Sequence, residues 1–260
     1  ILVDYVVVAE NQANHMQTFG TQHNEDFYRS DVVHKQSAKR YPLNERKVIA
    51  RRAAMLLNED IKVLNYGIGV PEIIATVLQE EGMNDRFTPT LEPGAIGGTA
   101  AGGLDFGCSI GPQAIIDQPY MFDYYDGGGI DAAFLGLAQC DTKGNINVSK
   151  FGPKIAGCGG FINITQNARQ IAFCGTFTAG GLKVQAGSGK LEILQEGKAK
   201  KFIEDVEQIT FSGDVARENN KKVIYITERA VFELLPEGLT LTEIAPGINL
   251  EKDILSQMNF

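Results

Sequence analysis

The sequence predicts an α/β protein with an open, largely parallel sheet and helices on its faces. Strand-like apolar segments lie near residues 62–66, 86–91, 113–117, 132–138, 170–174, 190–195 and 223–227. Helical patterns separate several of them, and this alternation is typical of parallel sheets. In addition, many of the 29 glycines gather in loops. Glycine lets the backbone come close to a ligand, so these loops suit a binding rim at the strand ends.

The first 44 residues differ from the rest of the chain. Residues 1–9 are apolar and rich in valine, so we expect a strand there. They lack the basic start of a signal peptide and resemble an interior strand, so we expect the chain to be part of a longer one. Residues 10–44 are polar and aperiodic, which favours a connecting segment or a flap over a site. The expected division is therefore a connecting region over 1–44 and a domain over 45–260.

A helix, a strand and a second helix are expected next. Asn44 suits an N-cap, and apolar residues recur at helical spacing through Glu45–Asn58. A strand follows over Lys62–Tyr66. A second helix should begin at Pro71 and close at Gly82, since proline and glycine favour these two ends.

Between this strand and helix lies the turn Gly67-Ile68-Gly69-Val70-Pro71. Backbone N–H groups at a helix start can bind a phosphate or an oxyanion. The alternative is a βα turn with only a packing role, because the third glycine of a dinucleotide fingerprint is missing.

The segment Leu91–Ala100 places one carboxylate, Glu92, at the head of a glycine-rich turn. Glycines at 94, 97 and 98 permit positive φ and should keep the approach to the carboxylate free of side chains. Pro93 fixes its own φ and removes an amide donor beside Glu92. The alternative is an ordinary type II turn with Pro93 and Gly94 at its centre.

A third glycine cluster covers Ala156–Ile162 and includes Gly159 and Gly160. In isolation it suits a simple loop. Cys158 could be a nucleophile, but no histidine can be assigned to it as a base, and a small buried hydrophobe is the expected role. The three histidines lie in the first 34 residues and the four cysteines form no C-x-x-C pair, so we expect no metal site. Reduced thiols of this kind suit a cytoplasmic protein.

Charge and hydropathy exclude two classes of partner. The net charge of −8 argues against a nucleic-acid or anionic-membrane surface, where basic patches are expected. No apolar run approaches the ~20 residues that a membrane span requires. We therefore expect neither nucleic acid nor membrane as a partner.

Three segments together resemble the family I coenzyme A transferases, in particular the propionate and acetate CoA-transferase branch. T-L-E-P-G-A-I-G-G around Glu92 fits the E-x-G-x-x-G-G pattern of the family's active-site glutamate. Asn65–Pro71 is similar to the family's N-L-G-I-G-x-P segment, and Ala156–Ile162 to its G-x-G-G loop. The resemblance covers nearly all of the chain, including His15–Gly20 and the ending Ile244–Leu255.

The resemblance implies a role for each segment. Glu92 would attack an acyl-CoA thioester as a covalent nucleophile. Residues Gly67–Pro71 would contact coenzyme A, and the N–H of Gly160 would stabilise the oxyanion formed in acyl transfer. Coenzyme A would then be a substrate and a covalent intermediate, and no cofactor would be bound permanently.

The match is to the second half of the single-chain enzymes, or to the β chain of their two-subunit relatives. The N-terminal half, with its own CoA loop and an amide side chain for the oxyanion hole, is not in this sequence. We therefore expect acyl-CoA and short-chain carboxylates as substrates and the α-subunit-like half as a partner. The complete enzyme is expected to be a homo-oligomer in the cytoplasm.

Two other functions fit the same residues. A sugar-phosphate isomerase or deaminase would use Glu92 as a base and the start of the second helix for phosphate. A non-catalytic ligand sensor would keep the fold, and Glu92 would be dispensable. Function resides in the site rather than in the fold, so the sequence leaves both open, together with the identity of the acyl chain.

Overall fold

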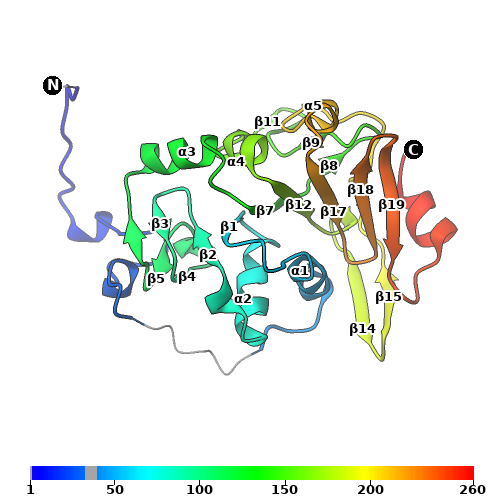
Figure 1. Cartoon of the computed structure of the whole chain (residues 1–260), viewed down its shortest axis with the longest axis horizontal. Helices are drawn as coiled ribbons and strands as arrows, with labels where there is room; N and C mark the ends of the chain where they lie inside the picture. The colour runs from blue at the N-terminus through cyan, green and yellow to red at the C-terminus, as the bar shows by residue number, and fades with distance from the viewer. Residues whose placement is uncertain (1, 33–39) are drawn as a thin grey trace.

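A sheet of nine strands forms the centre of the molecule, for which the computed structural model describes residues 2–32 and 40–260. The strands lie in the order β19-β18-β17-β12-β7-β1-β2-β3-β6 (Figure 1). Their bounds are β1 Val63–Tyr66, β2 Thr88–Thr90, β3 Ala95–Ile96, β6 Ala114–Ile115, β7 Ala132–Gly136, β12 Gln170–Cys174, β17 Lys222–Ile226, β18 Ala230–Leu235 and β19 Gly238–Ile244. The strands from β17 to β2 run parallel, and both edges are antiparallel. The expected open, largely parallel sheet is confirmed.

Short antiparallel pairs lie outside the central sheet. They are β4 Thr99–Ala100 with β5 Ser109–Ile110, β8 Gln139–Cys140 with β9 Ile146–Asn147, β10 Lys150–Phe151 with β11 Lys154–Ile155, β13 Thr178–Ala179 with β16 Ala199–Lys200, and β14 Lys183–Gly187 with β15 Lys190–Gln195. The strand expected near 190–195 is thus present as β15, but in a hairpin and not in the sheet. Its mostly exposed side chains differ from those of a central parallel strand, which is buried on both faces.

Two pairs of helices cover the two faces of the sheet (Figure 1). Among the described residues, the α-helices are α1 Glu45–Ala54, α2 Glu72–Glu80, α3 Gln118–Asp126, α4 Phe161–Asn167 and α5 Gly213–Glu218. Alternate residues of β7 join two separate cores. Ala132 and Phe134 pack with α1 and α2, whereas Ala133 and Leu135 pack with α3 and α4. The helices therefore bury both faces of the parallel strands.

The ends of the first two helices follow from their capping residues. The Asn44 side chain accepts a hydrogen bond from the Lys47 N–H at 3.0 Å, as predicted for an N-cap. Helix α1 ends at Ala54, earlier than expected, because the N–H groups of Leu56 and Leu57 bond three residues back and tighten the last turn. Pro71 precedes α2, and Gly82 follows it with φ +67°.

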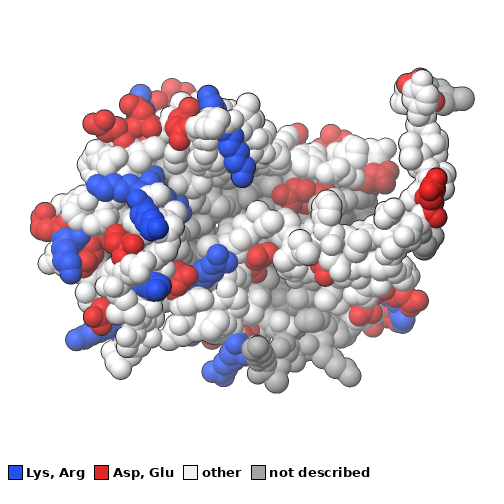
Figure 2. All heavy atoms as spheres, turned by 180° about the vertical axis from the view of Figure 1, so that it is seen from behind, with Lys and Arg blue, Asp and Glu red and all other residues white. Residues whose placement is uncertain are grey.

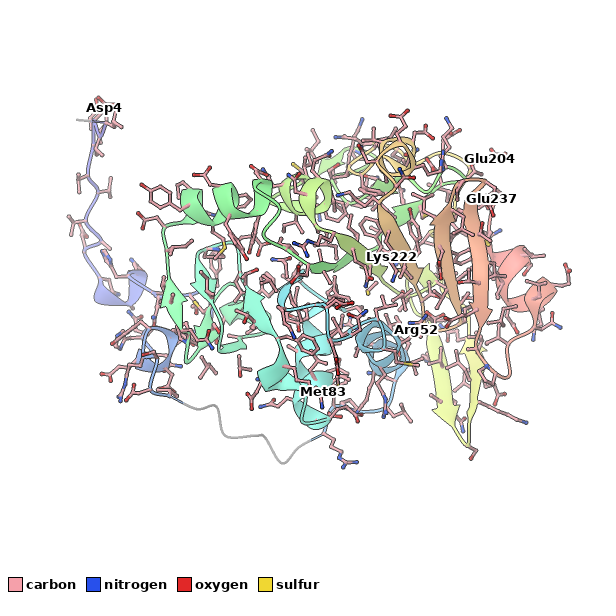
Figure 3. The ribbon with its side chains drawn as sticks, viewed as in Figure 1. Asp4, Arg52, Met83, Glu204, Lys222 and Glu237 are labelled. Carbon is pink, nitrogen blue, oxygen red and sulfur yellow. The ribbon has the colours of Figure 1, made fainter. Side chains whose placement is uncertain are left out.

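The N-terminal segment forms no strand over residues 2–9, contrary to the prediction, and residue 1 lies outside the described residues. Its apolar side chains are exposed; Val7, for example, is 91% exposed. Figure 3 shows Asp4 near the tip of this segment, which extends away from the rest of the chain. A strand needs a neighbour to bond its N–H and C=O groups, and none lies beside it among residues 2–32 and 40–260. Apolar residues with a high β-propensity were therefore not sufficient to form a strand here.

The surface carries charges of both signs. On the face seen in Figure 2, basic and acidic side chains are intermingled and form no single basic patch. In the part of the chain that the structure describes, no helix is long and apolar enough to cross a membrane.

Candidate active site

The direction of the strand order changes at β1. The chain passes from β1 to β2 on one side and later returns to β7 on the other side of β1. Ligands of open α/β sheets bind at the carboxyl ends of the strands near such a switch point. The loop Gly67–Pro71 follows β1 and Glu92 follows β2, while Gly160 precedes α4, which leads to the start of β12. The topology thus brings all three predicted segments to one edge of the sheet.

Glu92 is the second of the four residues that connect β2 to β3. The Leu91 N–H donates to the Ala95 carbonyl at 3.0 Å, and the Gly94 N–H donates to the Leu91 carbonyl at 2.9 Å. The centre of this turn is therefore Glu92 and Pro93, and the alternative with Pro93 and Gly94 at the centre is wrong. A tight turn closed by two backbone bonds holds the Glu92 backbone firmly.

The glycines after Glu92 adopt the predicted backbone but for a different reason. At Gly94, Gly97 and Gly98, φ is +121°, +75° and +72°. A Cβ on Gly94 would lie 1.8 Å from the Ile116 carbonyl oxygen, and one on Gly98 would lie 2.4 Å from that of Ile110. These glycines make room for the chain around residues 109–116. Their packing does not support the expectation that they keep the approach to the carboxylate free of side chains.

Gly160 lies directly against Glu92. A Cβ on Gly160 would lie 3.2 Å from Glu92 Cγ and 3.1 Å from the ring of Phe122. Gly160 is the N-cap residue of α4, with φ −77° and ψ 0°. Within residues 2–32 and 40–260 its N–H has no hydrogen-bond acceptor, as is usual in the first turn of a helix. A free backbone donor therefore lies beside the candidate nucleophile.

The Glu92 carboxyl group is in an environment that disfavours its charge. Burial raises the pKa of Glu92, and its own backbone amide and the Asn65 side chain offset part of that rise. Its Oε2 atom is buried and accepts no hydrogen bond from the described residues. A carboxylate with few hydrogen bonds keeps its lone pairs available, which suits a nucleophile or a base.

Sequence reasoning gave no role to three residues around Glu92, namely Asn65, Phe122 and Tyr125. Asn65 is fully buried in β1, with its Nδ2 donating to the Thr90 carbonyl and to the Tyr125 hydroxyl. One signal was available for Asn65, because an asparagine in an apolar strand needs a reason to be buried. The two aromatic residues lie on α3, and no local pattern separates them from ordinary core residues.

The loop Gly67–Pro71 is pinned at its start and open at its middle. The Gly67 N–H donates to the Phe134 carbonyl at 2.8 Å, whereas Ile68 is 66% exposed and Gly69 has φ +92°. Burial raises the pKa of Glu72, in the first turn of α2, and the amides of Gly103 and Gly69 offset part of the rise. Glu72 Oε2 is buried, lies close to Gly102 and accepts no hydrogen bond from the described residues, so a carboxylate is already near the helix start proposed for a phosphate.

Asp131 has a structural role, and the structure tests no role of Cys158. Asp131 accepts hydrogen bonds from the N–H groups of Lys62 and Val63 at 2.9 Å, so it caps the start of β1. Cys158 is a free thiol in the loop before Gly160. Among the described residues, no group of histidine, cysteine and carboxylate side chains could hold a metal ion.

Comparison with known proteins gives the family. No protein-family model matches the chain. The chain is 30% identical over 224 residues to the acetate CoA-transferase subunit beta of Escherichia coli, covering 80% of this chain and 89% of that subunit. The chain belongs to the family I coenzyme A transferases. Within the family it corresponds to the β-subunit-like half that carries the glutamate segment.

Longer members of the family are more similar in sequence. The chain is 46% identical over 260 residues to the acetate CoA-transferase YdiF of Escherichia coli O157:H7 and 47% identical over 264 residues to the caffeate CoA-transferase of Acetobacterium woodii. Each match includes the whole chain but only 48% and 50% of the relative, so the chain spans about half their length. A crystal structure of YdiF as a thioester complex with CoA superposes with a TM-score of 0.79 at 48% identity, over 85% of this chain and 42% of that one.

Proposed function

We propose that this chain is the catalytic-glutamate half of a CoA-transferase that moves coenzyme A from a short-chain acyl-CoA to a carboxylate acceptor. One observation carries the proposal. Glu92, whose Oε2 is buried and accepts no hydrogen bond from the described residues, packs against Gly160, whose N–H has no acceptor among those residues. Acyl transfer needs a nucleophile and a donor for the oxygen that becomes negative, and both are present here.

In the proposed reaction, Glu92 forms two covalent intermediates in turn. A carboxylate oxygen attacks the thioester carbonyl, and the C–S bond breaks to give a mixed anhydride and CoA thiolate. The thiolate then attacks the Glu92 carbonyl carbon, which releases the donor carboxylate and leaves a γ-glutamyl-CoA thioester. An acceptor carboxylate reverses both steps and leaves as the new acyl-CoA. Two acyl transfers replace one slow direct exchange.

The tetrahedral intermediates carry an oxyanion, and the Gly160 N–H is the donor we assign to it. Glycine suits this position because even one methyl group would press on Glu92 and Phe122. The raised pKa of Glu92 makes the carboxylate more basic and hence more nucleophilic, and it also sets an acid limit to activity, because the protonated form cannot attack.

We assign coenzyme A to the loop Gly67–Pro71. The exposed side chain of Ile68 and the positive φ of Gly69 leave backbone of this loop accessible at the carboxyl edge of the sheet. The thioester complex with CoA described for YdiF supports coenzyme A as substrate and covalent intermediate. No cofactor needs to be bound permanently for this chemistry.

The partner we propose is the N-terminal, α-subunit-like half of the enzyme, and residues 1–44 would belong to the connection with it. Exposed apolar side chains support such a partner; they include Ile68, Leu104, Tyr120, Ile155 and Ile162. The exposed valines of residues 2–9 would find a strand partner there. We also propose that the complete enzyme is a homo-oligomer. A cytoplasmic location is part of the proposal as well, because four free cysteines suit that compartment.

The test is to trap the covalent intermediate. The chain, with the N-terminal half supplied, is incubated with acetyl-CoA in the absence of an acceptor and analysed by intact mass and peptide mapping. We expect CoA attached to the peptide that contains Glu92, discharge of the adduct by a short carboxylate, and negligible turnover without the N-terminal half. An adduct on Cys158, or no adduct with both halves present, would reject the glutamyl mechanism.

A further inference from the structure

Phe122 is an aromatic side chain beside Glu92 to which the proposed reaction gives no role. It lies on α3, which packs next to α4 (Figure 1). Two atoms at the tip of its ring, Cζ and Cε1, would lie 3.1 and 3.2 Å from a Cβ on Gly160, and Glu92 Cγ would lie 3.2 Å from the same point. The tip of the ring therefore faces the place where Gly160 and Glu92 meet.

The space between the ring of Phe122 and Glu92 is narrow. Because the ring tip and Glu92 Cγ both lie within 3.2 Å of one point, they are at most twice that distance apart. A carbon group placed between two others needs about 3.5 to 4.0 Å on each side, or roughly 7 to 8 Å in all. No methyl group fits between the two side chains, so the ring closes this side of Glu92.

The core holds the ring of Phe122 in this position. Tyr125 follows one turn later on the same face of α3, is fully buried, and packs edge-on against Phe122 at a centroid distance of 5.8 Å. Phe122 itself is only partly buried and lies at the margin of the core that α3 and α4 cover. One side of the ring is thus fixed by packing, and the rest of its surface is available to a substrate.

The proposed reaction brings the acyl group to this ring. In the mixed anhydride the acyl carbonyl carbon is bonded to a Glu92 oxygen, so the next carbon of the acyl group lies only a few bonds from Glu92 Cγ. The oxyanion is assigned to the N–H of Gly160, the residue that the ring tip faces. A straight acyl chain can extend away from the ring and turn only hydrogens toward it. An acyl group branched at its first carbon has a second carbon substituent, which needs the space that the ring closes.

We propose that Phe122 is a specificity-determining residue, because its ring excludes acyl groups that are branched at the carbon next to the carbonyl. The inference rests on the proposed function, since it takes Glu92 as the residue that carries the acyl group. Straight short-chain acyl-CoA donors are accepted, and their branched isomers are rejected. One carbon more or less in an apolar pocket changes kcat/KM by about 10- to 200-fold, so the selection should be of that order.

The experiment compares butyryl-CoA with its branched isomer isobutyryl-CoA, with acetate as the acceptor and both halves of the enzyme present. The two donors contain the same atoms, so the ratio of their kcat/KM values reports on shape. We expect butyryl-CoA to be favoured by at least about 10-fold in the unsubstituted enzyme and this ratio to fall by about 10-fold in Phe122→Ala. Phe122→Leu deletes the ring tip but keeps an apolar side chain at the margin of the core. Its ratio should lie between the other two, and it serves as the test if Phe122→Ala does not fold.

Tyr124→Leu is the matched control on the same helix. The ring of Tyr124 lies against Gly129, where a Cβ would be 2.3 Å from Tyr124 Cζ, so this variant shortens an aromatic side chain away from Gly160. It should keep the ratio of the unsubstituted enzyme. An equal loss of kcat/KM for both donors in the Phe122 variants would mean that the ring only supports the fold. Faster hydrolysis of both donors at an unchanged ratio would mean that the ring only excludes water, and either result overturns the inference.

A binding measurement keeps this test separate from the proposed function. The affinities of butyryl-CoA and isobutyryl-CoA are measured by calorimetry in Glu92→Gln and in the same protein with Phe122→Leu added, and neither measurement requires turnover. The preference for butyryl-CoA should be smaller in the double variant. If the unsubstituted enzyme transfers no CoA, the proposed function fails and the affinity ratio alone decides the role of Phe122. If it transfers CoA, the ratio of the kcat/KM values decides.

Discussion

Gly160→Ala is a small change at the point of contact between the two candidate catalytic residues. The substitution keeps the backbone N–H that we assign to the oxyanion and adds one methyl group. The φ of −77° and ψ of 0° are accessible to alanine, so the backbone itself is not strained. The new Cβ would lie 3.2 Å from Glu92 Cγ and 3.1 Å from Phe122 Cζ. Only these side chains have to move.

The size of the effect follows from those distances. Ordinary contacts of a Cβ begin at 3.4 Å, so the neighbours must give way by 0.2 to 0.3 Å. A displacement of about 1 Å in a catalytic group can cost about 10²-fold in rate. If the logarithm of the rate falls in proportion to the displacement, a shift of this size should lower the rate of glutamyl-CoA formation by about threefold. Gly160→Pro, which removes the N–H, should lower kcat by about 10²-fold or more.

The assay is the single-turnover rate of glutamyl-CoA formation with both halves present, together with the melting temperature. Gly187→Ala is the matched control, because no atom lies within 4 Å of a Cβ on Gly187 and its φ is not positive. The control should react at the rate of the unsubstituted enzyme. If Gly160→Ala reacts as fast as Gly187→Ala, the contact between residue 160 and Glu92 does not affect the rate. If Gly160→Pro keeps a normal kcat with its circular dichroism unchanged, the assignment of the N–H to the oxyanion is wrong.

Three further predictions concern single side chains. Glu92→Gln should bind coenzyme A but form no adduct by intact mass, and normal turnover by this variant would reject the nucleophile. Glu72→Gln removes the charge that the amides of Gly69 and Gly103 stabilise, so the Gly67–Pro71 loop should be held less firmly. KM for acetyl-CoA should then rise about threefold with kcat unchanged, as expected when uniform binding is lost. An unchanged KM would count against this loop as the CoA site. Burial lowers the pKa of Lys201 to about 8. Below that pH the buried ammonium group lowers the stability of the folded chain. This cost disappears as the pH rises from 8 to the pKa of Lys201 in the unfolded chain. Relative to Lys201→Met, the unsubstituted chain should therefore gain about 3 kcal/mol in free energy of unfolding from pH 8 to 10.5 by urea titration, and parallel pH curves for the two proteins would contradict this.

Much of the architecture was accessible from local sequence. The Asn44 cap, the strand at Val63–Tyr66 and the helix after Pro71 depend on side chains within a few residues of each other, and all three are as predicted. The strand predicted over residues 1–9 failed because a strand also needs a neighbour. Residues 190–195 formed a strand, but its place in a hairpin depended on pairing with β14, which no local pattern specifies.

The candidate site divides in the same way. Glu92, Gly160 and the Gly67–Pro71 loop could be named from the sequence, because each lies in a motif whose spacing is continuous along the chain. Their contact could not be named, since Glu92 and Gly160 meet only when the strand order places β2 and the start of α4 at one edge. Asn65 and Tyr125 depend on that arrangement as well. A buried hydrogen bond between residues 60 positions apart is made by packing and not by any local preference, so only the tertiary structure could decide it.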